Sequence, residues 1–302
     1  MAAHDSTPAL RRVRRALRAW YATEHRDFPW RGTRDPYAVL VSEVMLQQTQ
    51  ASRVAERFPR FMARFPSVDV LATASSAEVL VEWNGLGYNR RALALQRDAA
   101  TVARDGWPRT VDSLLMLDGI GPYTARAVAS LAFGVPAGVV DTNVRRWLLR
   151  RFGVPDRPAA LQELADRLAV PAGPDEVAAW THASMEFGAR VCRARSPRCD
   201  ACPIASGCPS RGRAATIRVP RQAALRGSSR AYRGAVLALL TGAASRAMEE
   251  LELRSALDGR ETAIGPPLGD AGWQRVLAGL AADGLVHRSD GMVALGEATI
   301  EA

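Results

Sequence analysis

Four cysteines lie close together near residue 200, and the chain has no others. They are Cys192, Cys199, Cys202 and Cys208, which gives the spacing C-x6-C-x2-C-x5-C. Grouped thiols form either a metal site or disulfides, and a reducing compartment favours the metal site. We expect a reducing compartment because the polar, then arginine-rich N-terminal segment lacks the apolar stretch of a secretory signal.

The cysteine spacing discriminates between metals. Structural zinc sites usually contain two closely spaced ligand pairs such as C-x2-C, and only one C-x2-C occurs in this chain. Four cysteines within one short segment suit a [4Fe–4S] cluster, in which each iron takes one thiolate. We therefore favour the cluster, with zinc and unliganded structural cysteines as the alternatives.

The pattern of apolar residues predicts a mostly α-helical chain whose C-terminal part differs from the rest. Helices are predicted in the first part at residues 10–22, 37–50, 67–83 and 89–103. Residues 211–230 lose apolar periodicity and gather Arg, Pro, Gly and Ser, which is typical of a linker. Beyond the linker, helices at 232–240 and 273–282 and a hairpin around Asp290 predict a small α+β, winged-helix-like module over 231–302.

Charge and composition restrict the partners and the chemistry. A formal net charge of +9 and an isoelectric point near 10.3 favour a polyanionic partner. All 40 basic residues are arginine, so no lysine side chain is present for Schiff-base chemistry. The longest apolar runs, such as residues 236–240, are too short to span a bilayer, and we expect no membrane association.

Two glycines and an aspartate mark a candidate DNA-binding hairpin and a candidate catalytic group. Gly119 and Gly121 lie in the segment Leu-Asp-Gly-Ile-Gly-Pro-Tyr-Thr-Ala at 117–125. Such a turn can expose backbone amides at a helix N-terminus and hold a phosphate, although an ordinary helix–helix turn is the alternative. Asp141 follows the apolar pair Val-Val at 139–140, where it could be a helix N-cap or a catalytic carboxylate.

Three further segments complete the set of motifs. They read Phe-Pro-Trp-Arg at 28–31, Ser-Glu-Val-Met-Leu-Gln-Gln-Thr-Gln at 42–50 and Trp-Asn-Gly-Leu-Gly-Tyr at 83–88. Glu43 lies beside an apolar Val-Met-Leu run, which indicates a partly buried helix, where an unpaired carboxylate is costly.

Together with the hairpin, Asp141 and the cysteines, these segments resemble the MutY family of adenine DNA glycosylases, in the helix-hairpin-helix superfamily of endonuclease III. The resemblance covers residues 20–210. It implies a two-lobed helical glycosylase domain over 8–210 that carries an iron–sulfur cluster loop. The six-helix lobe would span about 32–140, and the cluster lobe about 8–31 and 141–210.

The resemblance implies a mechanism that uses two carboxylates. Glu43 would protonate N7 of adenine and then activate water, while Asp141, oriented by Asn143, would stabilise or covalently trap the sugar cation. For these roles Glu43 needs a raised pKa and Asp141 a low one. Tyr123 occupies the position of the Schiff-base lysine of bifunctional relatives, which implies a monofunctional enzyme.

The resemblance also implies DNA contacts. It assigns Trp30 and Arg31 to the wall of the adenine pocket, Gln48 and Tyr88 to wedges in the base stack, Leu46 to the DNA-binding group, and Gly119 and Gly121 to a phosphate contact. The implied partner is duplex DNA with A:8-oxoguanine or A:G mispairs. We expect a monomer in the cytoplasm of a bacterial-type cell, associated with the nucleoid.

The sequence departs from the family pattern at three places, of which Asn89, where a second tyrosine is frequent, is expected to have little consequence. His182 lies where relatives often place Glu or Gln against adenine, and we expect partly exposed packing there. The C-terminal part lacks the Phe-Ser-His tripeptide of the Nudix-like domain that recognises 8-oxoguanine, and is short for that domain. The C-terminal part therefore contains no recognisable element for discrimination of 8-oxoguanine.

Two other functions are compatible with parts of this pattern. A thymine or uracil glycosylase acting on mismatches with guanine would share the hairpin, Asp141 and the cluster. A non-catalytic iron–sulfur regulator that binds nucleic acid would share the cluster and the positive charge, but it would not need Glu43 and Asp141.

Overall fold

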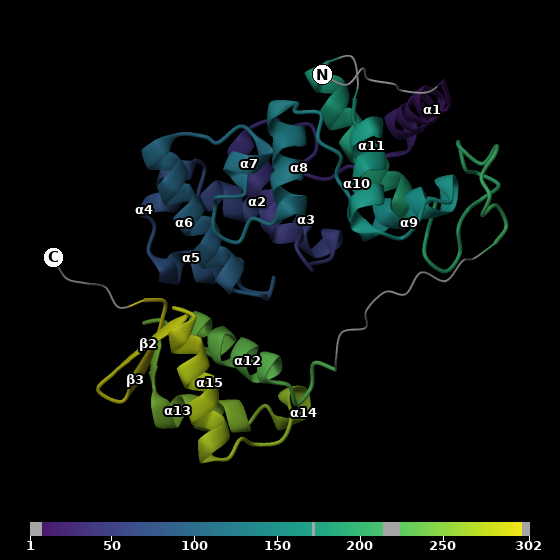
Figure 1. Cartoon of the computed structure of the whole chain (residues 1–302). Helices are drawn as coiled ribbons and strands as arrows, with labels where there is room; N and C mark the ends of the chain where they lie inside the picture. The colour runs from purple at the N-terminus through teal and green to yellow at the C-terminus, as the bar shows by residue number, and fades with distance from the viewer. Residues whose placement is uncertain (1–7, 171–172, 214–223, 298–302) are drawn as a thin grey trace. The chain divides into compact units, whose positions relative to one another are not determined.

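The computed structural model describes residues 8–170, 173–213 and 224–297. The chain forms two compact units, of which the first contains residues 1–43 and 107–219 and the second contains residues 44–106 and 220–302. Helices predominate in both units, and a small sheet occurs in the second (Figure 1). The mostly α fold class predicted from the sequence is therefore confirmed, while the predicted lobe boundaries stay a prediction.

The first unit is a helical bundle. Its helices are α1 (Pro8–Glu24), α7 (Val111–Leu114), α8 (Pro122–Phe133), α9 (Thr142–Phe152), α10 (Pro158–Leu168) and α11 (Pro174–Arg190). The apolar face predicted for α1 is buried at Leu10, Val13 and Leu17. Because α11 packs against α1, α8 and α9, it connects the bundle.

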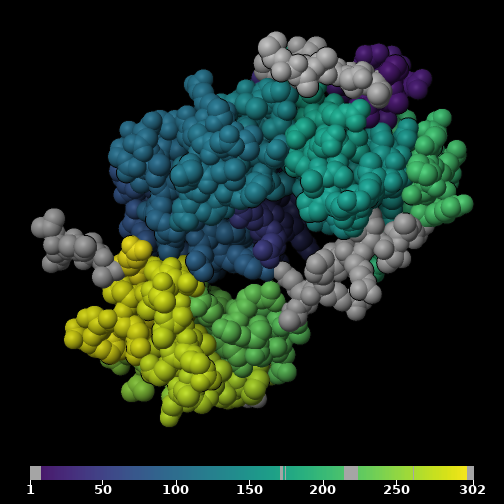
Figure 2. Space-filling model, in the orientation of Figure 1, coloured from purple at the N-terminus to yellow at the C-terminus, as the bar shows by residue number. Residues whose placement is uncertain are grey.

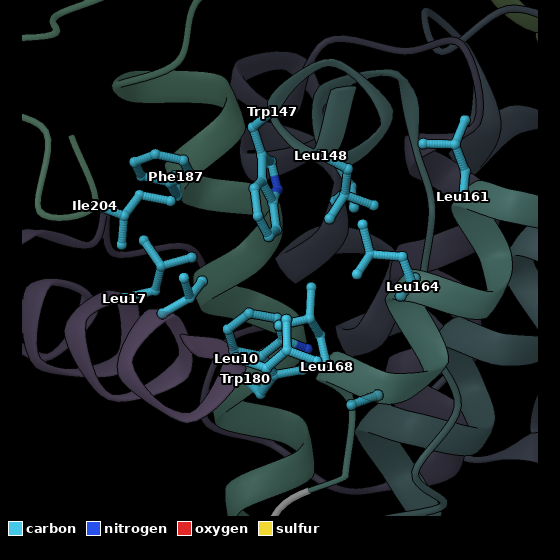
Figure 3. Packing of buried hydrophobic residues seen from close by; sticks show 14 of the residues in the cluster. Leu10, Leu17, Trp147, Leu148, Leu161, Leu164, Leu168, Trp180, Phe187 and Ile204 are labelled. Carbon is cyan, nitrogen blue, oxygen red and sulfur yellow. The ribbon is translucent and has the colours of Figure 1, made fainter. Parts of the chain in front are cut away.

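Aromatic side chains form the centre of this bundle (Figure 3). The fully buried Trp147 of α9 packs edge-to-face against Trp180 and Phe187 of α11, with ring centroids 6.3 and 5.7 Å apart. Leu17 of α1 lies in the same cluster. Large aromatic side chains bury much apolar area, so this contact holds α9 and α11 in a fixed relation.

The helix α2 (Pro36–Leu46) carries Glu43 and is buried over most of its length. Asp35 begins it, because its carboxylate accepts from the amides of Tyr37 (3.2 Å) and Ala38 (3.1 Å). The prediction that this helix continues to residue 50 is wrong. Gln48 has a φ of 56°, in the left-handed region that ends an α-helix.

The second unit contains α3 (Ala51–Arg64), α4 (Val68–Thr73), α5 (Ser76–Trp83) and α6 (Arg90–Asp105). A single helix over 67–83 was predicted, and that prediction is wrong, because Ser75 begins a new helix. The Ser75 hydroxyl accepts from the amide of Glu78 at 3.3 Å, and the Glu78 carboxylate accepts from the amide of Ser75 at 3.0 Å. This reciprocal capping separates α4 from α5.

The C-terminal part of the second unit has the order of a winged helix. Its elements are α12 (Ser229–Gly242), β1 (Ala247–Glu249), α13 (Glu250–Asp258), α14 (Glu261–Ile264), α15 (Asp270–Ala282), β2 (Val286–Ser289) and β3 (Met292–Leu295). The three strands are antiparallel in the order β1-β3-β2. The predicted hairpin turns at Asp290 and Gly291, which both have positive φ, as a two-residue hairpin turn requires.

The small α+β module predicted from the sequence is thus confirmed, although β1, α13 and α14 were not predicted. Residues 214–223 of the predicted linker and 298–302 of the predicted module lie outside the described residues. Within the second unit, the Glu297 amide donates to the Ser76 hydroxyl at 2.9 Å, and Arg230 donates to the Tyr88 hydroxyl at 3.3 Å. Among the described helices, none has the length and apolarity needed to cross a membrane.

Candidate active site and cluster loop

Glu43 is a buried carboxylate near the end of α2, with 3% of its surface exposed. Burial, as the largest cause, and the nearby charge of Asp141 raise the pKa of Glu43 to about 7, although a hydrogen bond with Tyr123 acts in the opposite direction. The raised pKa predicted for Glu43 is thereby confirmed. Its Oε2 atom has no hydrogen-bond partner among the described residues, so one carboxylate oxygen remains able to exchange a proton with a substrate.

Tyr123 lies in the first turn of α8 and connects the two carboxylates electrostatically. Burial, followed by the charges of Glu43 and Asp141, raises the pKa of Tyr123 well above its usual value. The phenol therefore stays protonated and can donate to Glu43. Its hydroxyl also lies 3.4 Å from Sδ of Met185 in α11.

Asp141 is both a helix N-cap and a member of this buried group. Its Oδ1 accepts from the Val144 amide at 2.6 Å, which begins α9, and its Oδ2 accepts from Nδ2 of Asn143 at 2.8 Å. Burial raises the pKa of Asp141, although these hydrogen bonds oppose the shift. The low pKa expected from the sequence is wrong in direction, because burial outweighs the hydrogen bonds that favour the carboxylate.

The structure thus brings together Glu43, Tyr123, Asp141 and Asn143. It also adds Arg146, one turn beyond Asn143 on α9, which the sequence analysis did not single out. Nη2 of Arg146 donates to Oδ1 of Asn143 at 2.8 Å, and Nε donates to the Cys192 carbonyl at 2.7 Å. A chain of hydrogen bonds therefore connects Asp141 with the start of the cysteine loop.

The hairpin before α8 has the predicted form. Gly119 has a φ of 70°, which favours glycine, and Gly121 is the N-cap of α8. A side chain added at Gly121 would meet no atom within 4 Å. The backbone at the N-terminus of α8 is therefore accessible to a phosphate, whose charge the helix dipole favours.

Trp30 and Arg31 lie beside a buried ion-pair network that the sequence analysis missed. Glu186 of α11 has a side chain only 1% exposed and accepts from Nη2 of Arg31 at 2.7 Å and from Nε of Arg26 at 2.7 Å. Burial alone would raise the pKa of Glu186, but these hydrogen bonds outweigh it and lower the pKa to about 2. Trp30 is buried and stacks on Phe28, with ring centroids 4.7 Å apart.

His182 lies one turn before Glu186 on α11 and is partly buried, as predicted. Its ring stacks on Tyr21 with centroids 6.3 Å apart and planes 9° apart. Burial, followed by the charge of Arg31, lowers the pKa of His182 to about 3, so the imidazole is neutral at physiological pH. The spacing of four residues between His182 and Glu186 was the available signal that both share one helix face.

Leu46, Gln48 and Tyr88 belong to the second unit. Leu46 is the last residue of α2, Gln48 is two residues beyond it, and Tyr88 precedes α6. Gln48 and Tyr88 both have a left-handed backbone, with φ of 56° and 49°. Their side chains are exposed.

The four cysteines line one hollow beside α9. The hollow also contacts Trp147 and Phe187 of the core. None of the four cysteines is in a disulfide, and no three ligand-type side chains of the described residues are placed to hold a single ion. Four sulfurs spread around one hollow suit a group that binds one sulfur at each of four irons.

Arginines of α9 hold the cysteine loop. Arg150 donates to the carbonyl oxygens of Arg193 (2.7 Å) and Ala194 (2.8 Å), and Arg151 donates to that of Gly207 (3.1 Å). The loop, drawn in green, lies beside the teal helices of the first unit (Figure 2). Both halves of the loop are therefore attached to the helix that begins at Asp141.

Comparison with known proteins assigns this arrangement to a family. The model of the HhH-GPD superfamily of base excision DNA repair proteins matches residues 41–170. An adenine DNA glycosylase of Mycobacterium tuberculosis is 40% identical over 299 residues, which cover 92% of this chain and 92% of that protein. The chain belongs to the adenine DNA glycosylase family.

Solved structures of other glycosylases share the fold of this adenine DNA glycosylase family member. A thermostable thymine-DNA glycosylase matches with a TM-score of 0.62 and 32% identity, over 68% of this chain and 97% of that one. Endonuclease III in a non-covalent DNA complex matches with a TM-score of 0.57 and 25% identity, over 70% of this chain and 98% of that one. The resemblance inferred from the motifs is confirmed.

The cluster is confirmed as well. The model of the iron–sulfur binding domain of endonuclease III matches residues 192–208, from the first cysteine to the last. The loop of this adenine DNA glycosylase family member is a [4Fe–4S] cluster loop. When bound, the cluster supplies a fixed anchor for the four cysteine side chains.

Proposed function

We propose that the protein hydrolyses the N-glycosidic bond of adenine mispaired with 8-oxoguanine or guanine in duplex DNA, without lyase activity. The observation that carries this proposal is the buried Glu43, whose pKa of about 7 leaves it partly protonated at neutral pH. Membership of the adenine DNA glycosylase family supports adenine as the base. We further propose that the enzyme acts as a monomer on nucleoid DNA.

Each carboxylate has a separate role in this proposal. Glu43 donates a proton to N7 of adenine, because its free Oε2 can carry that proton, and the resulting carboxylate then activates water. Asp141 stabilises the positive charge that develops at C1′ of the sugar, and the hydrogen bonds from Val144 and Asn143 favour its charged form.

The remaining residues orient these groups. Tyr123 stays protonated and donates to Glu43, so it can help to hold the carboxyl group in place. Arg31, held by Glu186, and Trp30 form the wall against which adenine binds after it leaves the base stack. Gln48, Tyr88 and Leu46 contact the opened duplex, and the amides near Gly119 and Gly121 bind a phosphate.

The C-terminal module bears on the identity of the base opposite adenine. The described part of the C-terminal module has its helices and three strands in a winged-helix-like order, and its sequence lacks the tripeptide used by Nudix-like domains. Both A:8-oxoguanine and A:G are therefore proposed substrates, with no preference assigned to the C-terminal module.

A panel of duplexes tests this function. Purified protein is incubated with duplexes that contain A:8-oxoguanine, A:G, T:G or U:G, and the released base is identified chromatographically. We expect adenine from the first two duplexes and no base from the last two. Release of thymine or uracil alone would favour the thymine-DNA glycosylase function of the structural neighbour. No release, with binding retained, would favour a non-catalytic regulator.

A further inference from the structure

The side chain of Arg91 connects two loops of the second unit. The first loop follows α2 and carries Gln48, and the second precedes α6 and carries Tyr88. Both residues have a positive φ, a conformation that is uncommon for non-glycine residues and a clear outlier for a bulky one. Some interaction must therefore hold the two loops in this strained form.

The guanidinium of Arg91 supplies that interaction, because its bonds divide between the loops. Nη1 donates to two carbonyl oxygens in the last turn of α2, those of Val44 (2.6 Å) and Met45 (3.1 Å), and to that of Gln47 (2.6 Å) in the first loop. Nη2 donates to the Thr49 hydroxyl (3.1 Å) of the first loop and to the carbonyl oxygens of Leu86 (3.4 Å) and Gly87 (2.9 Å) of the second. Nε donates to the carbonyl oxygen of Tyr88 at 3.3 Å.

Some of these carbonyl groups have no hydrogen-bond donor within their own helix. The carbonyl groups of Val44 and Met45 belong to the last turn of α2, where intrahelical donors are missing. A cation is also favourable at a helix C-terminus. A positive φ strains the backbone of Gln48 and Tyr88, because neither residue is a glycine. The hydrogen bonds from Arg91 offset this strain.

Two aromatic rings help the hydrogen bonds to fix the position of the Arg91 guanidinium. It lies 5.3 Å from the ring centroid of Trp83 and 5.5 Å from that of Tyr88, within the range of cation–π attraction. Burial lowers the pKa of Arg91 to about 10, which leaves the group charged at neutral pH. A planar, charged fork is thus held between the two loops.

We propose that Arg91 is a positioning residue that holds Gln48 and Tyr88 in the conformation that enters the base stack, so that opening a base pair requires no rearrangement of either loop. The inference rests on the proposed function, because only in that function do Gln48 and Tyr88 contact DNA. Arg91 itself touches no reacting atom. Its contribution is to hold Gln48 and Tyr88 in their DNA-binding conformation before the duplex binds.

The test compares paired and unpaired adenine in single-turnover assays. Arg91→Lys keeps the charge but loses the planar fork that reaches both loops. Arg104→Met is the matched control, because Arg104 lies at the exposed far end of α6, where it pairs with its neighbour Asp105. The substrates are an A:8-oxoguanine duplex and a duplex with adenine opposite an abasic-site analogue, and the burst amplitude gives the fraction of active enzyme.

We expect Arg91→Lys to release adenine from the A:8-oxoguanine duplex roughly 10- to 100-fold more slowly per active site than the wild type. The defect should shrink several-fold with unpaired adenine, because an unpaired base costs less to flip. The control should match the wild type on both duplexes. A purely structural role would instead lower the active fraction and slow both substrates equally.

A milder variant keeps the proposal testable if Arg91→Lys does not fold. Thr49→Val preserves shape but removes one acceptor of Nη2. We expect a smaller defect, about 3- to 10-fold, with the same dependence on base pairing. Equal rates for the variants and the wild type, or equal defects on both duplexes, would overturn the role of Arg91. If the wild type releases no adenine from either duplex, the proposed function fails instead.

Discussion

Arg146 donates a hydrogen bond of 2.8 Å to the side-chain oxygen of Asn143, and thereby fixes the amide whose nitrogen donates to Asp141. The same guanidinium donates to the carbonyl oxygens of Cys192 (2.7 Å) and Gly188 (2.6 Å). The cysteine loop and the carboxylate at the start of α9 are consequently held by one buried side chain. A change in the conformation of the cysteine loop should therefore alter the hydrogen bonding of Asp141.

The first prediction concerns this link. Arg146→Lys keeps the charge but cannot make all three bonds, and we expect adenine release to slow by about 10- to 100-fold. Affinity for duplex DNA should change less, because the residue is buried. Arg145→Lys is the matched control, since Arg145 is partly exposed and pairs with Asp156. Single-turnover rates and fluorescence anisotropy measure the two effects, and an equal loss in both variants would contradict the link.

The second prediction is a pH profile. Glu43 must be protonated to donate to adenine, and its pKa is about 7. The single-turnover rate should fall about tenfold per unit as pH rises above 7. It should also fall in acid, where Asp141 becomes protonated, and that limb should lie above the usual range of an aspartate because burial raises its pKa. A rate that rises through pH 7 and stays level to pH 9 would exclude Glu43 as the proton donor.

The third prediction couples activity to stability. The pKa of Glu43 is raised above the unfolded value of 4.5, so the folded protein retains a proton that the unfolded chain releases, and stability falls as pH rises towards 7. Glu43→Gln removes this penalty and should be more stable than the wild type at pH 8.5, by about 3 kcal/mol. The difference should shrink at pH 5.5. The same variant should release adenine about 10²- to 10⁴-fold more slowly.

Melting curves at the two pH values measure the stability difference, with the activity assay run on the same preparations. If the variant is less stable than the wild type at pH 8.5, the favourable contacts of Glu43 outweigh the cost of its burial, and the prediction is wrong. Full activity of Glu43→Gln would contradict the proposed mechanism.

Sequence patterns predicted the parts of the site that carry distinctive residues. Glu43, Tyr123 and Asp141 lie far apart in the chain, but each lies in a motif with a recognisable spacing, and the structure places them together. Glu186, Arg91 and Arg146 were missed, because each acts through contacts with residues distant in sequence. No local pattern records that an arginine donates to carbonyl groups of another loop.

Local capping explains the errors in the helix predictions. Apolar periodicity continues across residue 75, but the Ser75 and Glu78 pair is a stronger signal and begins α5. The pKa of Asp141 was misjudged for a related reason. The motif indicated its hydrogen bonds, but the extent of its burial depends on tertiary packing, which one sequence does not reveal.

The fourth prediction follows from the absence of lysine from the sequence. No side chain can form an imine with the opened sugar, and Tyr123 stays protonated and cannot substitute. The wild type should release adenine and leave an intact abasic strand until alkali or heat is applied. Borohydride added during the reaction should trap almost no covalent complex on a denaturing gel. Efficient trapping would refute a monofunctional enzyme and leave the N-terminal amine as the candidate.

The fifth prediction concerns the surface of the cluster loop, where Arg193, Arg195 and Arg198 are all exposed. We expect these arginines to bind phosphates, so DNA binding should weaken steeply with salt, and removing one arginine should reduce the slope of log affinity against log salt by about one. Arg195→Met should show this reduction for matched and mismatched duplexes alike, because a phosphate contact does not depend on the bases. Arg104→Met removes the same charge from the C-terminal end of α6, in the second unit, and should keep the wild-type slope. If both variants lower the slope equally, the effect reflects net charge, and the cluster loop makes no phosphate contact of its own.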